Sequence, residues 1–174
     1  MNLLVLSTSL NPESYSRLLA RAAHAELAAA GHDATLLDLR DLPLPPCDGA
    51  AAYRHENTAR ARAAVAGAHG ILVATPIYNY DVNAVVKNLV ELTGKAWENK
   101  VVGFACTAGG AASYMSVMAF ANSLMLDFRC TIVPRFVYAT EADFAGETIA
   151  NADIARRTQE LATALARYTA ALKT

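Results

Sequence analysis

Short apolar runs alternate with longer helical segments along the chain, and this alternation restricts the fold more than any other feature. The apolar runs have the length of strands, and the segments between them have the length and composition of helices. Such a rhythm is typical of a parallel sheet with helices on both faces. We therefore expect an α/β fold with a doubly wound, five-stranded parallel sheet, its strands at 2–6, 34–39, 70–74, 101–106 and 131–137.

The helices between these strands are predicted from segments rich in alanine, the best helix former. Gly31 follows the first of them and is a natural C-terminal stop. The proline-rich segment 42–46 is interpreted as a rigid loop, because the strand–helix rhythm continues beyond it. We predict a single domain over residues 1–174, with helices at 16–30, 59–68, 83–93, 112–127 and 153–171.

The charge of the chain is nearly balanced, and this bears on its partners. Fifteen Lys and Arg stand against sixteen Asp and Glu, for a formal charge of −1. No segment concentrates basic side chains as phosphate-backbone binding requires, so we expect no nucleic-acid partner. The opening apolar run lacks a basic leader, and no stretch has the length of a bilayer-spanning helix. We expect no membrane partner and a cytoplasmic location.

The cysteines and histidines show no pattern of a reactive or metal site. Cys47, Cys106 and Cys130 lack the paired spacing of zinc or iron–sulfur ligands, and the four histidines share no metal-like spacing. We interpret the cysteines as small buried side chains and single out Cys106, because it ends a predicted strand. We expect no metal.

The position of the candidate site follows from the predicted fold. In a doubly wound sheet, ligands bind beyond the carboxyl ends of the strands, where the strand order reverses. The loops after the first, third and fourth strands are therefore the segments of interest. They read STSLNPESYSR at 7–17, TPIYNYDVN at 75–83 and TAGGAAS at 107–113.

The first of these loops is rich in hydroxyl groups and leads into a helix. Free N–H groups and the dipole at a helix start favour an anion. The Walker and GxGxxG patterns are both absent, so a phosphomonoester is the predicted ligand. The alternative is that Ser14 or Ser16 only caps the helix. The polar side chains of this loop are Ser7, Thr8, Ser9, Asn11, Ser14 and Ser16.

The other two loops have features that suit a flat ring. Segment 75–80 joins a rigid proline to two tyrosines, which can contact an aromatic face, while Asn79 can bond to ligand edges. The alternative is an ordinary turn with two tyrosines. In the third loop, Gly109 and Gly110 lack side chains, so backbone N–H groups beside Thr107 can approach a ligand closely.

Together the three loops resemble the NAD(P)H-dependent FMN reductase family, which has the flavodoxin-like fold, and the likeness covers nearly the whole chain. The first loop of that family often reads Gly-Ser-x-Arg-x-x-Ser-x-Asn before a basic residue, and Ser9, Ser14 and Arg17 match this pattern. Asn11 stands where the family commonly has arginine, and Ser16 where it has asparagine. We therefore expect neutralisation of the phosphate charge to depend more on the helix dipole and on hydroxyl groups.

The second loop carries the more specific part of the resemblance. Segment 76–79 matches the family's Pro-x-Tyr-Asn, and Lys87 and Asn88 match its downstream Leu-Lys-Asn, with Val86 in place of the leucine. Asn83 occupies the place of a frequent proline. We expect this change to loosen the start of the helix while leaving the ring-binding turn intact.

The resemblance implies an FMN-binding domain, with FMN as the cofactor and NAD(P)H as the co-substrate. The first loop would bind the phosphate, the second would line the isoalloxazine, and the third would meet its pyrimidine side. The implied cofactor-binding residues are Ser9, Asn11, Ser14, Tyr15, Ser16 and Arg17, then Pro76, Ile77, Tyr78 and Asn79, and finally Thr107, Gly109 and Gly110.

The resemblance also implies an FMN-dependent NAD(P)H oxidoreductase with ping-pong hydride transfer to a small-molecule acceptor: a quinone, a free flavin or an azo compound. This chemistry needs no acid, base or nucleophile from the protein, so we predict no catalytic residue. One alternative is a flavodoxin-type electron carrier, which the near-neutral charge disfavours. The other is a flavin-free binding module on the same fold.

Large apolar side chains in the predicted helix at 112–127 fall on one helix face, which is typical of core packing or a subunit contact. The resemblance implies a homodimer or a dimer of dimers, with the flavins near the interface. The spacing of one face is that of Met115, Met118 and Met125, and Tyr114 and Phe120 are further apolar side chains of the same helix.

Overall fold

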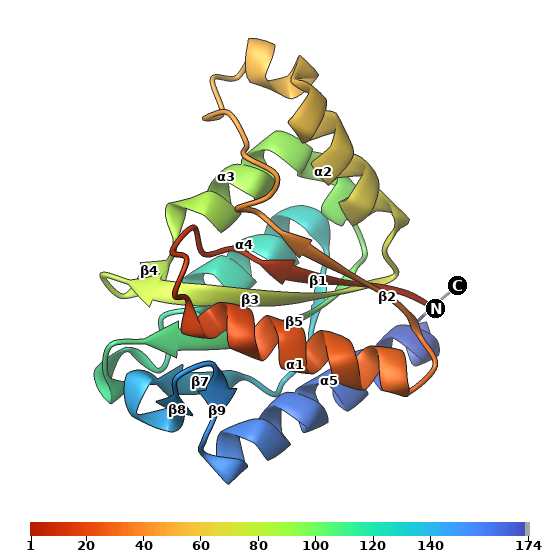
Figure 1. Ribbon diagram of the computed structural model, residues 1–174. Coiled ribbons are helices and arrows are strands. Elements are labelled where there is room, and N and C mark those ends of the chain that lie inside the picture. The colour runs from red at the N-terminus through yellow and green to blue at the C-terminus, as the bar shows by residue number, and fades with distance from the viewer. Residues whose placement is uncertain (173–174) are drawn as a thin grey trace.

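The computed structural model describes residues 1–172, in which a parallel sheet lies between two layers of helices (Figure 1). The strand order is β2-β1-β3-β5-β6, with the first strand between the second and third. This is the flavodoxin-like doubly wound order, and it confirms the predicted fold class. The last two residues of the predicted domain, 173 and 174, lie outside the described residues. The strands of the sheet are β1 (Asn2–Ser7), β2 (Asp33–Asp38), β3 (Gly70–Tyr78), β5 (Val101–Ala108), β6 (Thr131–Ile132) and β7 (Val137–Thr140).

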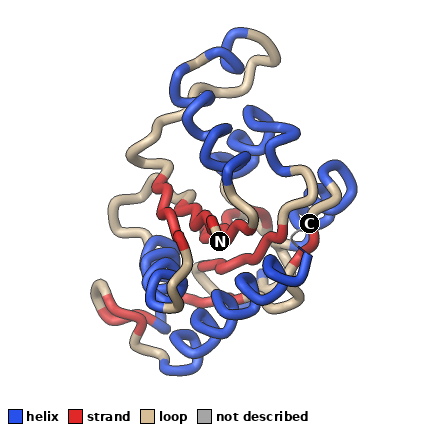
Figure 2. Tube along the Cα trace, turned by 90° about the vertical axis from the view of Figure 1, so that its right-hand side faces the viewer, coloured by secondary structure: helices blue, strands red, loops and turns tan. Residues whose placement is uncertain are grey.

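Five α-helices cover the two faces of the sheet, as Figure 2 shows with the strands seen between them. Helices α1 and α5 pack against one face, and α2, α3 and α4 against the other. Short 3-10 turns and two small hairpin strand pairs complete the connections. The helices are α1 (Tyr15–Ala29), α2 (Glu56–Gly67), α3 (Ala84–Thr93), α4 (Met118–Phe128) and α5 (Ala152–Leu172). The short elements are η1 (Ala51–Arg54), η2 (Gly94–Trp97), η3 (Ala111–Ser113), η4 (Glu141–Asp143), β4 (Asp81–Val82), β8 (Phe144–Ala145) and β9 (Thr148–Ile149).

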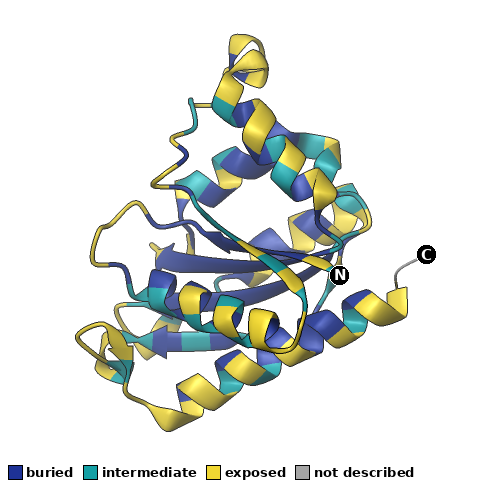
Figure 3. Ribbon diagram, turned by 45° about the vertical axis from the view of Figure 1, so that its right-hand side comes forward, coloured by how far each residue is buried: buried dark blue, intermediate teal, exposed yellow. Residues whose placement is uncertain are grey.

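The central strands are buried on both faces. Along β1, Leu3 and Val5 pack in the cluster with α1 and α5, whereas Leu4 and Leu6 pack in the cluster with α2, α3 and α4. All four side chains are at most 2% exposed, and Figure 3 shows the central strands uniformly buried between striped helices. Because both faces are covered, the strands are continuous apolar runs rather than alternating ones.

The outermost strand position differs from the prediction of one strand at 131–137. Strand β6 ends at Ile132 and β7 begins at Val137, and both pair with β5. Pro134 has no N–H to give to a ladder, and the N–H of Arg135 turns back to the carbonyl of Val133 at 2.8 Å. The segment between the two strands therefore leaves the sheet, and the prediction of a continuous strand was wrong.

The fourth helix is shorter than the predicted 112–127. It begins at Met118, after the separate turn η3. The N–H of Ser116 bonds to the carbonyl of Ser113, and that of Met118 to Met115, so tight turns replace the expected helical bonds.

The third strand is longer than the predicted 70–74 and ends in a hairpin. It continues through the segment expected to be a turn, and Tyr78 pairs with Asp81 of β4. The two residues between them, Asn79 and Tyr80, both have positive φ, at 50° and 63°. This is the requirement of a type I′ turn, in which asparagine is common and tyrosine is rare.

Candidate functional site

A cleft of about 360 Å³ lies beyond the carboxyl ends of β1, β3 and β5, at the switch point of the sheet. All three predicted loops contribute to it, together with η4. The cleft therefore brings together most of the predicted site residues, whereas Ser16, Arg17, Asn79 and Gly110 do not line it. Its lining residues are Ser9, Asn11, Glu13, Ser14, Tyr15, Pro76, Ile77, Tyr78, Thr107, Ala108, Gly109 and Glu141.

The serine hydroxyls at the start of α1 do not cap the helix. Ser14 is the N-cap residue, yet its side chain makes no capping bond, and its Oγ lies 2.9 Å from the Oγ of Ser16. Of the first-turn N–H groups, that of Arg17 bonds to the Ser14 carbonyl at 3.2 Å, and those of Tyr15 and Ser16 have no carbonyl partner within the helix. The capping alternative is therefore wrong for these two serines, and the helix start presents donors toward the cleft that Ser14 lines.

Local side-chain bonds shape the loop ahead of the helix. The Oδ1 of Asn11 accepts the N–H of Glu13 at 3.0 Å, and the Oγ of Ser9 accepts the N–H of Asn11 at 3.3 Å. Both are short-range turns of the kind that asparagine and serine form. Asn11 thus fixes the loop and supplies no positive charge where the family commonly has arginine.

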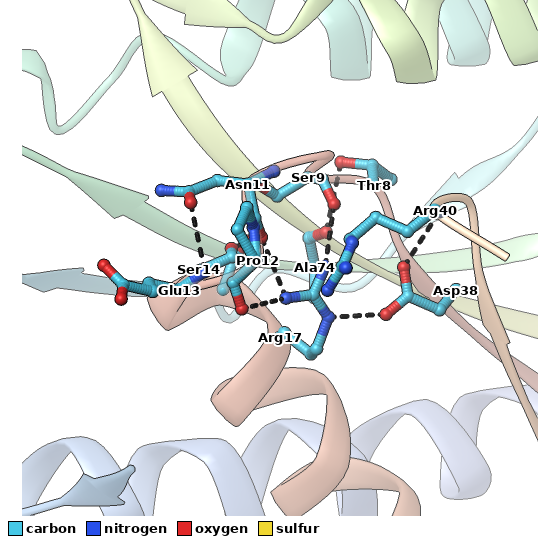
Figure 4. A network of polar contacts seen from close by, with 11 residues as sticks. Thr8, Ser9, Asn11, Pro12, Glu13, Ser14, Arg17, Asp38, Arg40 and Ala74 are labelled. Atoms are coloured by element: carbon cyan, nitrogen blue, oxygen red, sulfur yellow. Dashed lines mark hydrogen bonds and ion pairs between the residues drawn. The ribbon is translucent and has the colours of Figure 1, made fainter. Parts of the chain in front are cut away.

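Arg17 lies beneath this loop rather than in the cleft (Figure 4). Its side chain is buried, and its Nε donates to the Asp38 carboxylate at 2.5 Å. Its other nitrogens donate to the carbonyls of Asn11, Pro12 and Ser9 at 2.9 to 3.0 Å. The guanidinium therefore holds the loop from below, and Asp38 neutralises its charge.

Asn83 ties the first loop to the third strand and to α3. Its Nδ2 donates to the carbonyl of Thr8 at 2.7 Å, and its Oδ1 lies 3.1 Å from the Thr8 hydroxyl and 3.2 Å from that of Thr75. The same oxygen accepts the N–H of Val86, so Asn83 caps α3. The expectation of a looser helix start was wrong, because a buried carboxamide replaces the rigidity that proline would give.

The wall of the cleft opposite the first loop comes from the end of β3 and the loop after β5. Pro76 and Ile77 are buried within the strand, whereas Tyr78 is exposed at the rim, before the hairpin tip. The Oη of Tyr138 lies 2.6 Å from both the carbonyl of Gly110 and the Oγ of Ser113, which fixes the third loop. This loop is thus anchored by β7.

Residues that the sequence reasoning missed are Glu13, Ala108 and Glu141. The first two lie inside predicted loops, so position alone could have indicated them. Glu141 follows β7, the fifth strand position, whose carboxyl end points to the same edge and was not considered. The Oη of Tyr15 lies 3.5 Å from the Glu141 carboxylate, and its ring stacks on Phe144 at 4.6 Å. The cleft lining therefore holds two carboxylates and no cationic side chain.

Cys106, on β5, is not an activated nucleophile. The side chain of Cys106 is buried, and burial raises the pKa of its thiol to about 12. The thiol is therefore protonated at neutral pH and unreactive. In the part of the chain that the structure describes, no group of three or more His, Cys, Asp or Glu side chains is placed to hold a metal ion.

The residues present fit a flavin mononucleotide. Hydroxyls and first-turn N–H groups of α1 line the cleft on one side and can bind a phosphate, and the apolar end of β3 lines it on another and can contact a flat ring. No protein atom lies within 4 Å of the place a Cβ would take on Gly109, so the glycine leaves that part of the cleft open. The volume lies within the usual range for small-ligand sites.

A doubly wound sheet with such a cleft at its switch point defines a class of α/β proteins that bind phosphate-bearing cofactors. Within that class, the sequence pattern of the NADPH-dependent FMN reductase family matches residues 1–144, and the chain belongs to this family. FMN is the family's cofactor and NAD(P)H its co-substrate, as the sequence predicted.

Known proteins similar to this chain agree with that family. An NAD(P)H-dependent FAD/FMN reductase of Geobacillus thermodenitrificans is 30% identical over 109 residues, which are 62% of this chain and 59% of that relative's length. An oxidoreductase of Corynebacterium diphtheriae is 24% identical, with a TM-score of 0.72 over 95% of this chain and 97% of its own. The flavoenzyme FerB of Paracoccus denitrificans, an NAD(P)H:acceptor oxidoreductase, is 17% identical, with a TM-score of 0.79 over 98% and 97%. The two solved structures share the fold.

Proposed function

We propose that this chain is an FMN-dependent oxidoreductase that takes electrons from NADH or NADPH and passes them to a quinone, a free flavin or an azo compound. The observation that carries the proposal is the cleft where all three predicted loops meet at the switch point of the sheet. Membership of the NADPH-dependent FMN reductase family supports the same activity. The FMN-binding domain would comprise residues 1–174.

In this proposal each wall of the cleft binds a different part of FMN. Ser9, Ser14 and Tyr15, with the first-turn N–H groups of α1, hold the phosphate. Pro76 to Tyr78 and the segment 107–109 hold the two sides of the ring. Ser16, Arg17, Asn79 and Gly110, which were predicted as binding residues, would act by shaping the loops. When bound, FMN supplies a ring that accepts hydride from NAD(P)H and returns the electrons to an acceptor in a second half-reaction.

The protein itself would contribute position rather than proton transfer. The cleft has no histidine, lysine or cysteine among its lining residues, and its two carboxylates lie on the side of the first loop. Holding two flat rings in contact can supply much of the rate enhancement without a catalytic side chain. Tyr78, which lines the cleft and is exposed at its rim, can contact a face of the ring.

The competing function is a flavodoxin-type electron carrier, since the fold alone does not decide between them. A carrier guides its redox partners by a strong charge, and this chain has a formal charge of only −1. This observation favours the enzyme.

The deciding experiment is the visible spectrum of the protein reconstituted with FMN, before and after anaerobic addition of NADPH or NADH. Rapid bleaching of bound flavin is expected from the enzyme, and bound flavin that stays oxidised would support the carrier. Gly109→Val places a side chain in the open cleft and is expected to abolish flavin binding. Gly67→Val, where no atom lies within 4 Å of a Cβ position either, is the matched control at the end of α2.

The assembly is proposed to be a homodimer or dimer of dimers. Of the predicted apolar face, only Phe120 is buried in the core, and the other four side chains are exposed. Leu126 extends this surface, which we infer is covered by a second copy because a near-neutral chain offers little charge repulsion. Leu126→Asp is expected to convert the assembly to monomers in sedimentation experiments, and a wild-type protein that sediments as a monomer would contradict the proposal. The exposed residues are Tyr114, Met115, Met118, Met125 and Leu126.

Location and other partners are further expectations. No helix within residues 1–172 is long and apolar enough to span a membrane. The cytoplasmic location and the absence of a nucleic-acid partner stay predictions, which cell fractionation and a nucleic-acid binding assay can test.

A further inference from the structure

A pocket of about 580 Å³, which we call the Leu10 pocket, lies beside the candidate cleft. Leu10 lines it, whereas its chain neighbours Ser9 and Asn11 line the cleft, so the first loop borders both spaces. The other walls of the pocket come from the proline-rich loop after β2 and from the first two turns of α3. Within the described part of the chain, the pocket and the cleft share no lining residue.

Two asparagine side chains hold the proline-rich wall in place. The Nδ2 of Asn88, on α3, donates to the carbonyl of Pro45 at 3.0 Å, and its Oδ1 accepts the N–H of Cys47 at 2.8 Å. The Nδ2 of Asn57, on α2, donates to the carbonyl of Pro43 at 2.7 Å. Because these bonds fix the wall before any ligand arrives, binding costs little ordering of the chain.

The surface of the pocket is mainly apolar. Leu39 is buried, Leu44 and Val85 are half-buried, and Leu10 is 54% exposed. The side chain of Asn88, the polar uncharged residue of the lining, is already bonded to the loop at both of its ends. The apolar body of a ligand would therefore remove hydrocarbon surface from water on both sides of the contact.

Arg40 is the only charged residue among those from 1 to 172 that line the pocket. Its contact with Asp38 in Figure 4 comes from the backbone N–H, at 3.0 Å from Oδ1, while Oδ2 of the same carboxylate pairs with Arg17. Arg40 also borders the hollow at the start of α1, which Glu13 and Glu147 line, but it forms no ion pair with either carboxylate. Its positive charge is therefore available to an anion.

We propose that the Leu10 pocket is a binding site for a small apolar carboxylic acid. The hydrocarbon part lies against Leu10, Leu44 and Val85, and the carboxylate pairs with Arg40, whose planar guanidinium can donate two parallel hydrogen bonds to it. A cationic ligand would meet repulsion from Arg40, and a ligand with several charges would lose hydration against the apolar walls. The proposal does not depend on the proposed function, because the pocket is separate from the cleft.

Isothermal titration calorimetry with octanoate, octanol and octylamine tests the role of the charge, with excess FMN present to occupy the cleft. The three probes have the same chain and differ in the head group. Octanoate is expected to bind about tenfold more tightly than octanol, and octylamine, a cation at neutral pH, more weakly than either. Arg40→Ala should lower the affinity for octanoate to that for octanol and leave octanol binding within twofold. Arg60→Ala, at an exposed position of α2, is the control.

A second variant tests the space itself. Ala84 is exposed and lines the pocket at the first residue of α3, so Ala84→Trp fills the pocket and is expected to abolish the binding of octanoate and of octanol. Ala59→Trp, at an exposed position of α2, is the matched control.

The proposal would be overturned by octanoate binding that is unchanged in Arg40→Ala or in Ala84→Trp. It would also be overturned if the wild type bound no octanoate. Conversion of the assembly to monomers by Leu10→Asp in sedimentation experiments would in that case assign the pocket to a contact between two copies of the chain. Flavin binding is measured in the same samples, and its failure would refute the proposed function while leaving the octanoate result intact.

Discussion

The carboxamide of Asn83 bonds to Thr8 at both of its ends: Nδ2 donates to the Thr8 carbonyl at 2.7 Å, and Oδ1 lies 3.1 Å from the Thr8 hydroxyl. Both residues are buried and 75 positions apart in the sequence. This pair joins the loop proposed to bind the phosphate to α3, the helix that follows the β3–β4 hairpin. Its geometry links the two halves of the cleft.

Replacing Asn83 by alanine is expected to weaken folding and flavin binding together. The change removes the side-chain partner of the buried Thr8 carbonyl and of the Val86 N–H, at a cost of about 2 kcal/mol in the free energy of unfolding. The hydroxyls of Thr8 and Thr75 keep the carbonyls of Ala74 and Pro76 as partners. Urea unfolding and FMN titration measure the two effects. Arg60→Ala, at an exposed position of α2, is the control. Full flavin affinity in Asn83→Ala would mean that the two loops keep their places without this link.

Replacing Arg17 by lysine is expected to destabilise the apoprotein, although the positive charge is kept. Lysine can pair with Asp38 but cannot also donate to the three loop carbonyls that arginine bonds. The loss should be about 2 kcal/mol in urea unfolding without flavin, with weaker FMN binding as a consequence. Arg60→Lys is the control. Weaker FMN binding at unchanged stability would instead indicate that Arg17 contacts the ligand.

Replacing Asn11 by arginine is expected to tighten FMN binding about tenfold and to leave riboflavin binding unchanged. The cleft lining has carboxylates at Glu13 and Glu141 and no cation, so a new guanidinium would be the first cation there that can pair with a phosphate. Titration with the two flavins separates this effect from a change in ring binding. Ala59→Arg, at an exposed position of α2, adds the same charge elsewhere and serves as the control. An equal gain for riboflavin would show that the phosphate is not the cause.

The three thiols are expected to react at different stages of unfolding. Cys106 and Cys130 are buried, whereas Cys47 is half-buried, and all three are free. An alkylating reagent at about pH 8 should modify Cys47 in the native protein and the other two only in urea, because thiolate formation requires solvent. Mass spectrometry after timed labelling gives the order. Early modification of Cys106 would contradict the buried position.

Stability is expected to fall in alkaline solution, in part because of Cys106. Burial raises the pKa of this thiol to about 12, so the unfolded chain loses the proton first as the pH rises past about 8.5. The contribution is fully present below that pH and is lost progressively toward pH 12. Between about pH 8.5 and 10.5 the wild type should lose about 2 kcal/mol more of its unfolding free energy than Cys106→Val. Equal losses would contradict the raised pKa.

Much of the fold could be predicted because strand–helix alternation leaves few arrangements open. The hairpin after Ile77 could not be read from the sequence, since Asn79-Tyr80 lacks the glycine that usually indicates a type I′ turn. The break at Pro134 was missed because the residues on both sides have the composition of a strand.

The place of the candidate site was predictable from the sheet topology, but the direction of single side chains was not. Arg17, on α1, follows the family pattern, yet its orientation depends on Asp38, which lies at the end of β2. Asn83 was expected to loosen a helix because its partners Thr8 and Thr75 come close only in the folded chain. Contacts between distant segments decide such roles, and local patterns carry little information about them.

The interruption at Pro134 also bears on the behaviour of the protein at high concentration. The position shared by β6 and β7 lies at one edge of the sheet, where an unbroken strand would offer free N–H and C=O groups to a neighbouring molecule. Because residues 134–136 leave the sheet, a foreign strand finds only short stretches to pair with. The kink thus protects this edge against aggregation.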